Sequence, residues 1–367
     1  MKFIFLNEGF RMFRRKLQVS KNGFRRYSGD ANHVCRAIVN DCYNHEKNYF
    51  MASTGHFSEF WSRDFGLCVR SLKYLGYQKE IENTLKYALG KFCKNKSITT
   101  TISPVGKPFN FPTYAPDSLA FIVHSLVIAN NKEINVEYKD FIENEAKKFF
   151  EIVVDKDSGL VKKSHFSSMK DHAVRKSSCY DNVMVGWLSK NLKTLGFENP
   201  LSDYNFKKII KDNFWTGSYF LDDLSGRKFI TGDSNVFPFW TGVFNSRNMI
   251  NSAVKSVRKE GLDKPFPLKY SMKKSRVIWY GFFAKGYEFQ NIWPMMSYPY
   301  IELVSSIDKE LARVYLKRYS EVIEKNETFL EVYTPSGKPF KTLFYMTDEG
   351  MLWSAMHLRL SRNLLKN

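Results

Sequence analysis

A short segment near residue 60 combines side chains that suit contact with a sugar ring. Residues 54–66 read TGHFSEFWSRDFG, and they place Trp61, Arg63 and Asp64 where a helix is expected to begin. An indole can cover the apolar face of a sugar, while a guanidinium and a carboxylate form charge-assisted hydrogen bonds to its hydroxyl groups. His56 is a further candidate contact, with a purely structural role as the alternative. The segment therefore predicts a carbohydrate subsite.

Cleavage of a glycosidic bond needs two carboxyl groups in different surroundings. One protonates the leaving oxygen, and the other activates water or attacks carbon. Asp181 is the first candidate because it begins an otherwise apolar helix, with Tyr180, Met184 and Trp187 as neighbours. The alternative for Asp181 is a helix N-cap that accepts backbone N–H bonds and stays ionised.

Glu331 is the second candidate carboxyl. It lies between Leu330 and Val332 in an apolar, strand-like run, just before the turn sequence TPSG at 334–337. A hairpin around that turn would hold the carboxylate in a defined place. The alternative is an ordinary strand residue that faces solvent.

Other acidic residues lie in sequence contexts that are weaker evidence for a catalytic role. Asp222 and Asp223 follow two aromatic residues, and they can bind sugar hydroxyls or a cation or simply shape a turn. Asp348 and Glu349 suit the first turn of the last helix, where negative charge is favoured. The sequence contains no HExxH zinc motif, no GxSxG elbow, no P-loop and no dinucleotide fingerprint, so no metal or cofactor is expected.

The elements that must position these residues are mostly helices, arranged as helix, short turn, helix and long loop. The long loops are expected at 95–115 and 154–176, loops or short strands at 214–235, and a hairpin at 326–346. Because candidate residues lie in the loops or at helix starts beside them, they are expected to gather on one face of a helical scaffold. Helices are predicted at 30–45, 63–76, 78–94, 116–130, 138–153, 178–196, 203–213, 236–258, 291–304, 306–325 and 347–365.

Composition favours one large folded domain over residues 30–367, preceded by a basic extension at 1–29. Of the 367 residues, 43% are hydrophobic and 16% aromatic, which excludes disorder. The net charge of +19 comes from scattered Lys and Arg, so we interpret it as a solvated basic surface rather than a nucleic-acid site. Five cysteines without CxxC spacing and the lack of a long apolar run predict buried thiols in a cytoplasmic protein with no membrane span.

From about residue 30 to its end, the chain resembles the six-hairpin glycosidases, the (α/α)6-barrel clan of glucoamylase, trehalase, alkaline invertase and the processing α-glucosidases. Residues 60–65, FWSRDF, look like the clan's aromatic-x-Arg-Asp segment at the cleavage subsite. Residues 219–223, YFLDD, resemble its YFxDD segment, and residues 287–294, YEFQNIWP, a loop that ends in Trp-Pro. Residues 348–353, DEGMLW, are similar to its closing helix.

The resemblance implies an all-α (α/α)6 toroid with a few short strands, and an inverting hydrolase of α-glucosides that needs no cofactor. It implies that Asp181 is the general acid and Glu331 the general base, with their carboxyl groups about 6.5–9.5 Å apart. It also implies that the sugar contacts are drawn from Trp61, Arg63, Asp64, His56, Tyr180, Asp222, Asp223, Trp293 and Trp353.

Three alternatives stay open on the sequence alone. The first is a catalytically inactive barrel that only binds carbohydrate. The second is an epimerase or lyase on the same scaffold, which would rely on His56, His165 and His172. The third is a basic nucleic-acid-binding helical protein, whose binding would depend steeply on salt concentration. The expected partner is a carbohydrate substrate, without nucleic acid or membrane.

Overall fold

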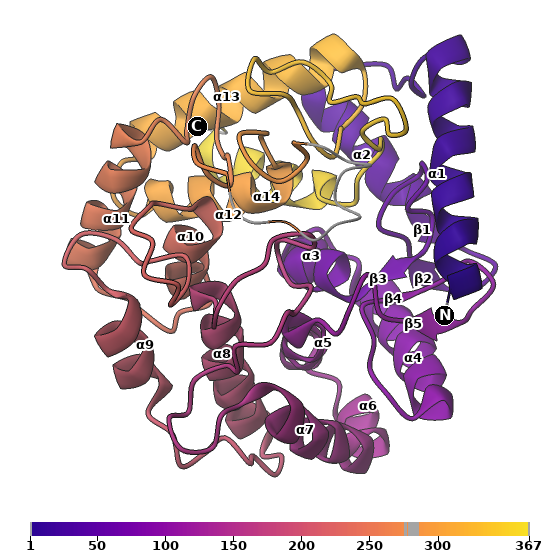
Figure 1. Cartoon of the computed structure of the whole chain (residues 1–367). Coiled ribbons are helices and arrows are strands. Elements are labelled where there is room, and N and C mark those ends of the chain that lie inside the picture. The colour runs from indigo at the N-terminus through magenta and orange to yellow at the C-terminus, as the bar shows by residue number, and fades with distance from the viewer. Residues whose placement is uncertain (1, 275–276, 278–285, 366–367) are drawn as a thin grey trace.

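A computed structural model describes residues 2–274, 277 and 286–365 (Figure 1). Most of these residues are helical, and the strands are two residues long. The strands are β1 (Tyr43–Asn44), β2 (Tyr49–Phe50), β3 (Phe60–Trp61), β4 (Thr101–Ile102) and β5 (Pro108–Phe109). The helices are α1 (Lys2–Asn22), α2 (Ala31–Asp41), α3 (Ser62–Tyr74), α4 (Gln78–Asn95), α5 (Pro116–Ala129), α6 (Lys132–Glu137), α7 (Lys139–Val153), α8 (Cys179–Leu195), α9 (Phe206–Phe214), α10 (Gly232–Trp240), α11 (Arg247–Lys259), α12 (Pro294–Ser305), α13 (Lys309–Asn326) and α14 (Ser354–Leu364).

Two kinds of helix alternate along the chain and form two concentric rings. Helices α5, α8, α10 and α12 are buried on nearly every side, which is the pattern of helices enclosed by others. Helices α2, α4, α7, α11 and α13 bury one stripe and expose the opposite face. The first set, with α3 and α14, therefore forms the inner ring, and the second set, with α9, surrounds it (Figure 1).

The inner ring is closed. Its members pack in the order α3, α5, α8, α10, α12 and α14, and α14 packs back onto α3 and onto the outer helix α2. In Figure 1 the colour accordingly runs round the ring until the yellow C-terminal helix meets the purple N-terminal ones. This confirms the predicted (α/α)6 toroid.

The helix expected at 30–45 ends at Asp41, and three other predictions differ more from the structure. The single helix expected at 236–258 is two helices, α10 and α11, because Pro238 lies inside α10 and Gly242 follows it at φ +69°. The last helix begins at Ser354 rather than at residue 347. The N-terminal extension, for which no helix was predicted, forms α1.

The predicted hairpin over 326–346 is present as a bent loop rather than as regular strands. Antiparallel bridges join Tyr333 to Pro339 and Lys341 to Met346. Its turn is closed by a hydrogen bond from the Gly337 amide to the Thr334 carbonyl at 2.9 Å, with Gly337 at φ +78°. A further bridge joins Leu330 to Glu349, so the strand that carries Glu331 lies beside the segment that precedes α14.

Candidate active site

Glu331 lies in an enclosed polar cluster. Its side chain is buried, and its oxygens accept hydrogen bonds from the Tyr287 hydroxyl, from the Tyr345 hydroxyl at 2.5 Å and from the Asp348 amide at 3.0 Å. Burial raises the pKa of Glu331 to about 8, against the lowering effect of these donors. The solvent-facing alternative is therefore wrong, and Glu331 is a carboxyl that can exchange a proton near neutral pH.

Asp348 ties this cluster to the segment at 53–57. Its carboxylate accepts a hydrogen bond from the Ser53 hydroxyl, and also from the amides of His56 at 2.9 Å and Phe57 at 3.0 Å. The His56 ring lies with Nδ1 3.2 Å from Asp348 and Nε2 3.2 Å from the Tyr345 hydroxyl. Burial lowers the pKa of His56 to about 4, so its ring is neutral at pH 7. The predicted sugar contact His56 is thus joined to Glu331 through Tyr345 and Asp348.

The WSRD segment is buried, and its polar groups contact other protein groups. Trp61 donates through Nε1 to Glu59 at 3.0 Å, and Arg63 donates through Nε to Asp117 at 2.7 Å. The predicted contacts Asp64 and Trp353 bind each other, with Trp353 Nε1 2.9 Å from Asp64 Oδ1. These bonds fix the orientation of the side chains. A role for them in sugar binding stays a prediction.

Asp181 is the third residue of α8, and Ser178 is the N-cap. Ser178 Oγ accepts from the Asp181 amide at 3.0 Å and donates to Asp181 Oδ2 at 2.6 Å, while the Ser168 hydroxyl donates to Oδ1. Burial raises the pKa of Asp181, and the Arg175 guanidinium opposes that effect. Both oxygens of Asp181 are engaged by serine hydroxyl groups, so the N-cap alternative is wrong and its acid role stays a prediction.

Asp171 is a candidate that the sequence reasoning missed. Its side chain keeps 21% of its surface exposed, and Oδ1 lies 3.7 Å from the Arg63 guanidinium without a hydrogen-bond partner. Burial raises the pKa of Asp171 to about 7; the Glu288 carboxylate adds to this effect and Arg63 opposes it. The one sequence signal was its place in the long loop at 154–176.

His172 connects Asp171 to the Glu331 cluster. Glu288 accepts from the His172 amide at 2.7 Å and lies 3.2 Å from His172 Nδ1. Burial favours the neutral form of Glu288, but the His172 contacts outweigh it and lower the pKa of Glu288. The His172 ring packs edge-on against Tyr287, the residue that binds Glu331, with ring centroids 6.2 Å apart. The chain neighbour of Asp171 therefore packs on the tyrosine that binds Glu331.

Each of the other predicted sugar contacts, Trp293, Tyr180 and Asp223, is hydrogen-bonded to another protein group. Trp293 lies in the Glu331 region, where its Nε1 donates to the Tyr287 carbonyl at 3.1 Å. Tyr180 donates to Asp117, the partner of Arg63, at 2.9 Å. Asp223 accepts from the Lys176 amide at 2.8 Å. A direct role for these residues in sugar binding stays a prediction.

Asp222 belongs to a buried network of two cations and two carboxylates. Lys170 Nζ lies 2.9 Å from Asp222 and 3.6 Å from Asp233, and Arg175 lies 2.9 Å from Asp233 and 3.6 Å from Asp222. All four side chains are almost fully enclosed. Since Lys170 and Arg175 flank Asp171 in the chain, the network anchors the loop that presents Asp171.

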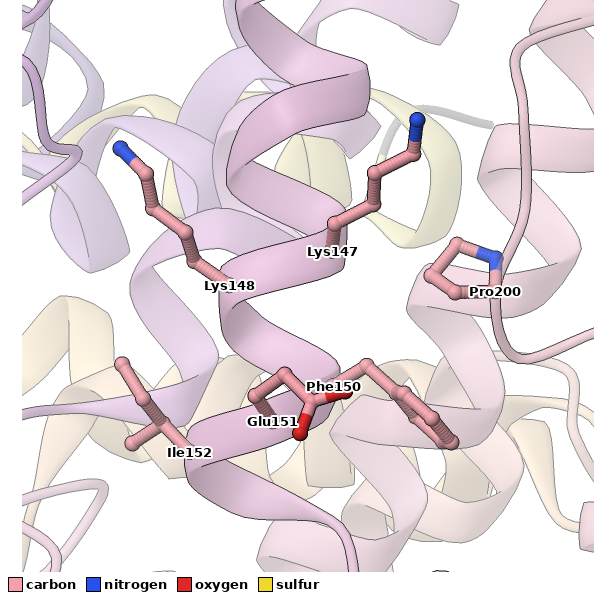
Figure 2. Close-up of a pocket in the computed structure, with 6 residues that line it drawn as sticks. All are labelled: Lys147, Lys148, Phe150, Glu151, Ile152 and Pro200. Atoms are coloured by element: carbon pink, nitrogen blue, oxygen red, sulfur yellow. The ribbon is translucent and has the colours of Figure 1, made fainter.

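A surface hollow lies elsewhere, beside the outer helix α7. Figure 2 shows its lining, which contains none of the predicted site residues. Lys147 and Lys148 form ion pairs at 2.8 Å with Glu198 and at 2.7 Å with Glu145. The lining residues are Lys147, Lys148, Phe150, Glu151, Ile152 and Pro200.

Solved structures with this architecture are known. A rhamnosidase from Klebsiella oxytoca with rhamnose bound superposes with a TM-score of 0.67 at 14% identity, over 91% of this chain and 63% of that one. A wild-type glycosidase gives 0.65 at 12% identity, over 98% of both chains. The chain has the (α/α)6 toroid fold of these structures. A GH63 mannosylglycerate hydrolase from Thermus thermophilus, in complex with Tris and D-glycerate, matches this fold at 0.63 and 9% identity, over 90% of this chain and all of that one.

These likenesses show the fold alone, because the sequence identities are low. The chain spans less than two thirds of the rhamnosidase. No family model and no curated protein sequence matches it. In the part of the chain that the structure describes, no group of three or more His, Cys, Asp or Glu residues is arranged to hold a metal ion. No helix among the described residues has both the length and the apolar composition needed to cross a bilayer.

The raised pKa values predict that Glu331 and Asp171 contribute less to the stability of the domain as pH rises. The pKa is about 8 for Glu331 and about 7 for Asp171 in the folded state, against ordinary values of 4.5 and 3.8. The folded state therefore binds more protons than the unfolded state between about pH 4 and 8, so the contribution of these groups is full at low pH and is lost as pH rises through the folded pKa values. Urea unfolding at pH 5, 6.5 and 8 should show that the free energy of unfolding of the wild type falls relative to that of Glu331→Gln. An equal fall in that variant would contradict the assignment.

Proposed function

We propose that this protein is a glycoside hydrolase that cleaves α-glucosidic bonds in a small glucan, oligosaccharide or disaccharide with inversion. One observation carries the proposal. Two loops of a six-hairpin scaffold each hold a carboxyl with a strongly raised pKa, the buried Glu331 and the partly exposed Asp171, and His172, the chain neighbour of Asp171, packs on Tyr287, which binds Glu331. Pairs of titratable groups held in different surroundings are what acid–base cleavage of a glycosidic bond requires.

Glu331 suits the general base. Its cluster of two tyrosine hydroxyl groups and one backbone amide donates hydrogen bonds to the carboxylate, which is the form that accepts a proton. In the proposed step Glu331 takes a proton from water, and the water oxygen bonds to the anomeric carbon on the face opposite the leaving group. The bond from that carbon to the leaving oxygen breaks at the same time.

Asp171 suits the general acid better than Asp181 does. A general acid must hold a proton and have an oxygen that is free to reach the leaving group. The side chain of Asp171 is partly exposed, whereas Asp181 is buried and both of its oxygens are bound by Ser168 and Ser178. We therefore assign proton donation to Asp171 and positioning of the Ser168 segment to Asp181.

The protonation states of Asp171 and Glu331 favour activity near neutral pH. The competent form has Asp171 protonated and Glu331 ionised. With pKa values of about 7 and about 8, this form is most populated midway between them, although it remains a minority of the molecules. The rate kcat/KM should then follow a bell-shaped pH profile centred between these values.

The experiment that tests the proposal is incubation with a panel of α-glucosides and detection of released sugar by anomer-resolved NMR. β-Glucose as the first product from an α-linked substrate supports inversion. Saturable binding without turnover would favour an inactive carbohydrate-binding barrel instead. Recovery of an unsaturated or epimerised product would favour a lyase or epimerase.

Paired variants distinguish the two acid candidates. Asp171→Asn should lower kcat on α-glucosides with poor leaving groups by about 10²-fold or more, because no proton reaches the leaving oxygen. The loss should be much smaller on α-glucosyl fluoride, whose leaving group needs little protonation. Asp181→Asn keeps the serine contacts in part and should show a similar, modest loss on both substrates. The reverse pattern would return the acid role to Asp181.

A further inference from the structure

The inner face of α1 carries two arginines one turn apart. Arg11 lies 2.5 Å from Glu59, and Arg15 forms an ion pair with Glu349. Both carboxylates have only 1% of their side-chain surface exposed, while the arginines keep 26% and 20%. The sequence interpretation of this basic run as a solvated surface is therefore wrong for these two residues. It holds for Arg14, which is exposed.

The Glu59 carboxylate is bonded to one part of the candidate site, and the backbone of Glu349 lies beside another part. Glu59 accepts the Trp61 indole N–H at 3.0 Å. Glu349 bridges to Leu330, the neighbour of Glu331, and it follows Asp348, whose amide donates to Glu331 at 3.0 Å. Arg11 thus contacts the glutamate that binds Trp61, the predicted sugar contact. Arg15 contacts the glutamate that follows Asp348, whose amide binds the proposed base Glu331.

The arginines matter because a buried carboxylate without a partner is costly. Removing one member of a buried pair leaves an uncompensated charge, and the loop that carries it must move towards water or take up a proton. Burial already raises the pKa of Glu59 to about 7, and Arg11 opposes that rise. Movement of either loop would displace Trp61 or the amide that binds Glu331.

We propose that Arg11 and Arg15 are positioning residues of the active site, Arg11 for Trp61 and Arg15 for Glu331, so that α1 completes the site from outside the barrel. The kinetic part of this proposal rests on the proposed glycosidase function. The contacts themselves do not depend on which reaction the protein catalyses.

Kinetics of three single variants and one control variant test the two roles. Arg15→Ala should lower kcat by about 10-fold to 100-fold with little change in KM and should shift the limb of the pH profile that reports Glu331, because small displacements of catalytic groups have effects of this size. Arg11→Ala should chiefly raise KM, because Trp61 is a predicted binding group. Arg15→Lys should recover most of kcat. Arg14→Ala, on the exposed face of the same helix, should behave like the wild type.

Hydrogen exchange measured by mass spectrometry gives a readout that does not need a substrate. Arg15→Ala should speed exchange in the peptide that contains residues 345–351, and Arg11→Ala in the peptide that contains residues 57–62, while Arg14→Ala should change neither. If the wild type hydrolyses no glycoside but these exchange changes occur, the function proposal fails and the positioning role survives. If Arg11→Ala and Arg15→Ala match Arg14→Ala in both exchange and kinetics, the positioning proposal is overturned. If Arg15→Ala does not fold, Arg15→Gln replaces it as the variant without the cation, and Arg15→Lys remains the variant that keeps the cation.

Discussion

Replacement of Glu331 by glutamine is expected to lower kcat by about 10³–10⁴-fold on any α-glucoside that the protein cleaves. Glutamine has nearly the size of glutamate, so it can fill the space between Tyr287, Tyr345 and Asp348, but it cannot take a proton from water. The variant should still bind substrate, so KM should change much less than kcat. Steady-state kinetics and isothermal calorimetry with the same substrate measure the two effects.

Glu327→Gln is the matched control for Glu331→Gln. Glu327 lies four positions earlier in the chain, in an exposed ion pair with Arg26, and its side chain is 45% exposed. The same change there should leave kcat within about twofold of the wild type, because exposed pairs contribute little. Substantial activity in Glu331→Gln would remove the base assignment, whatever the result for the control.

Disruption of the four-charge network beneath the Asp171 loop should have the largest effect on stability. Arg175→Met leaves Asp222 and Asp233 with Lys170 as their remaining cation, in a region that is almost fully enclosed. Removal of one partner from a buried pair costs about 3–5 kcal/mol, because the charge left behind is not compensated. Urea unfolding monitored by tryptophan fluorescence should show a loss of that size. Since the network anchors the loop, kcat should fall even where the variant is folded.

An exposed ion pair supplies the comparison for Arg175→Met. Lys208 and Asp212 pair at 2.5 Å on the surface of α9, one helical turn apart. Lys208→Met should leave the urea midpoint unchanged, because water already solvates both groups. An Arg175→Met variant as stable as Lys208→Met would show that the network does not anchor the loop.

Much of the fold was predictable because the helical signals are local. Apolar periodicity marks the outer helices, and residues such as Pro116 and Gly76 mark where helices begin or end. The errors have local causes too. Pro238 lies inside α10 rather than at its start, and the reversal at Gly242 is short, so the pattern of 236–258 appears continuous in the sequence.

The site was only partly predictable because its chemistry depends on tertiary contacts. Glu331 stood out because its own neighbours, Leu330 and Val332, are apolar. Asp171 did not, because the groups that set its pKa are distant in sequence: Arg63 in α3 and Glu288 in the loop before α12. Asp181 stood out for the apolar helix that follows it, yet the serines that bind its oxygens belong to the turn before that helix and to a loop.

The closed inner ring sets the order in which a newly synthesised chain can assemble. Its last member, α14, packs on α2 and α3, so the ring cannot close until almost the whole chain has left the ribosome. Arg15 emerges early, but its partner Glu349 belongs to the segment just before α14. A chain truncated before that segment would lack both the closing helix and the support of the Glu331 strand, so incomplete translation products should be free of hydrolytic activity.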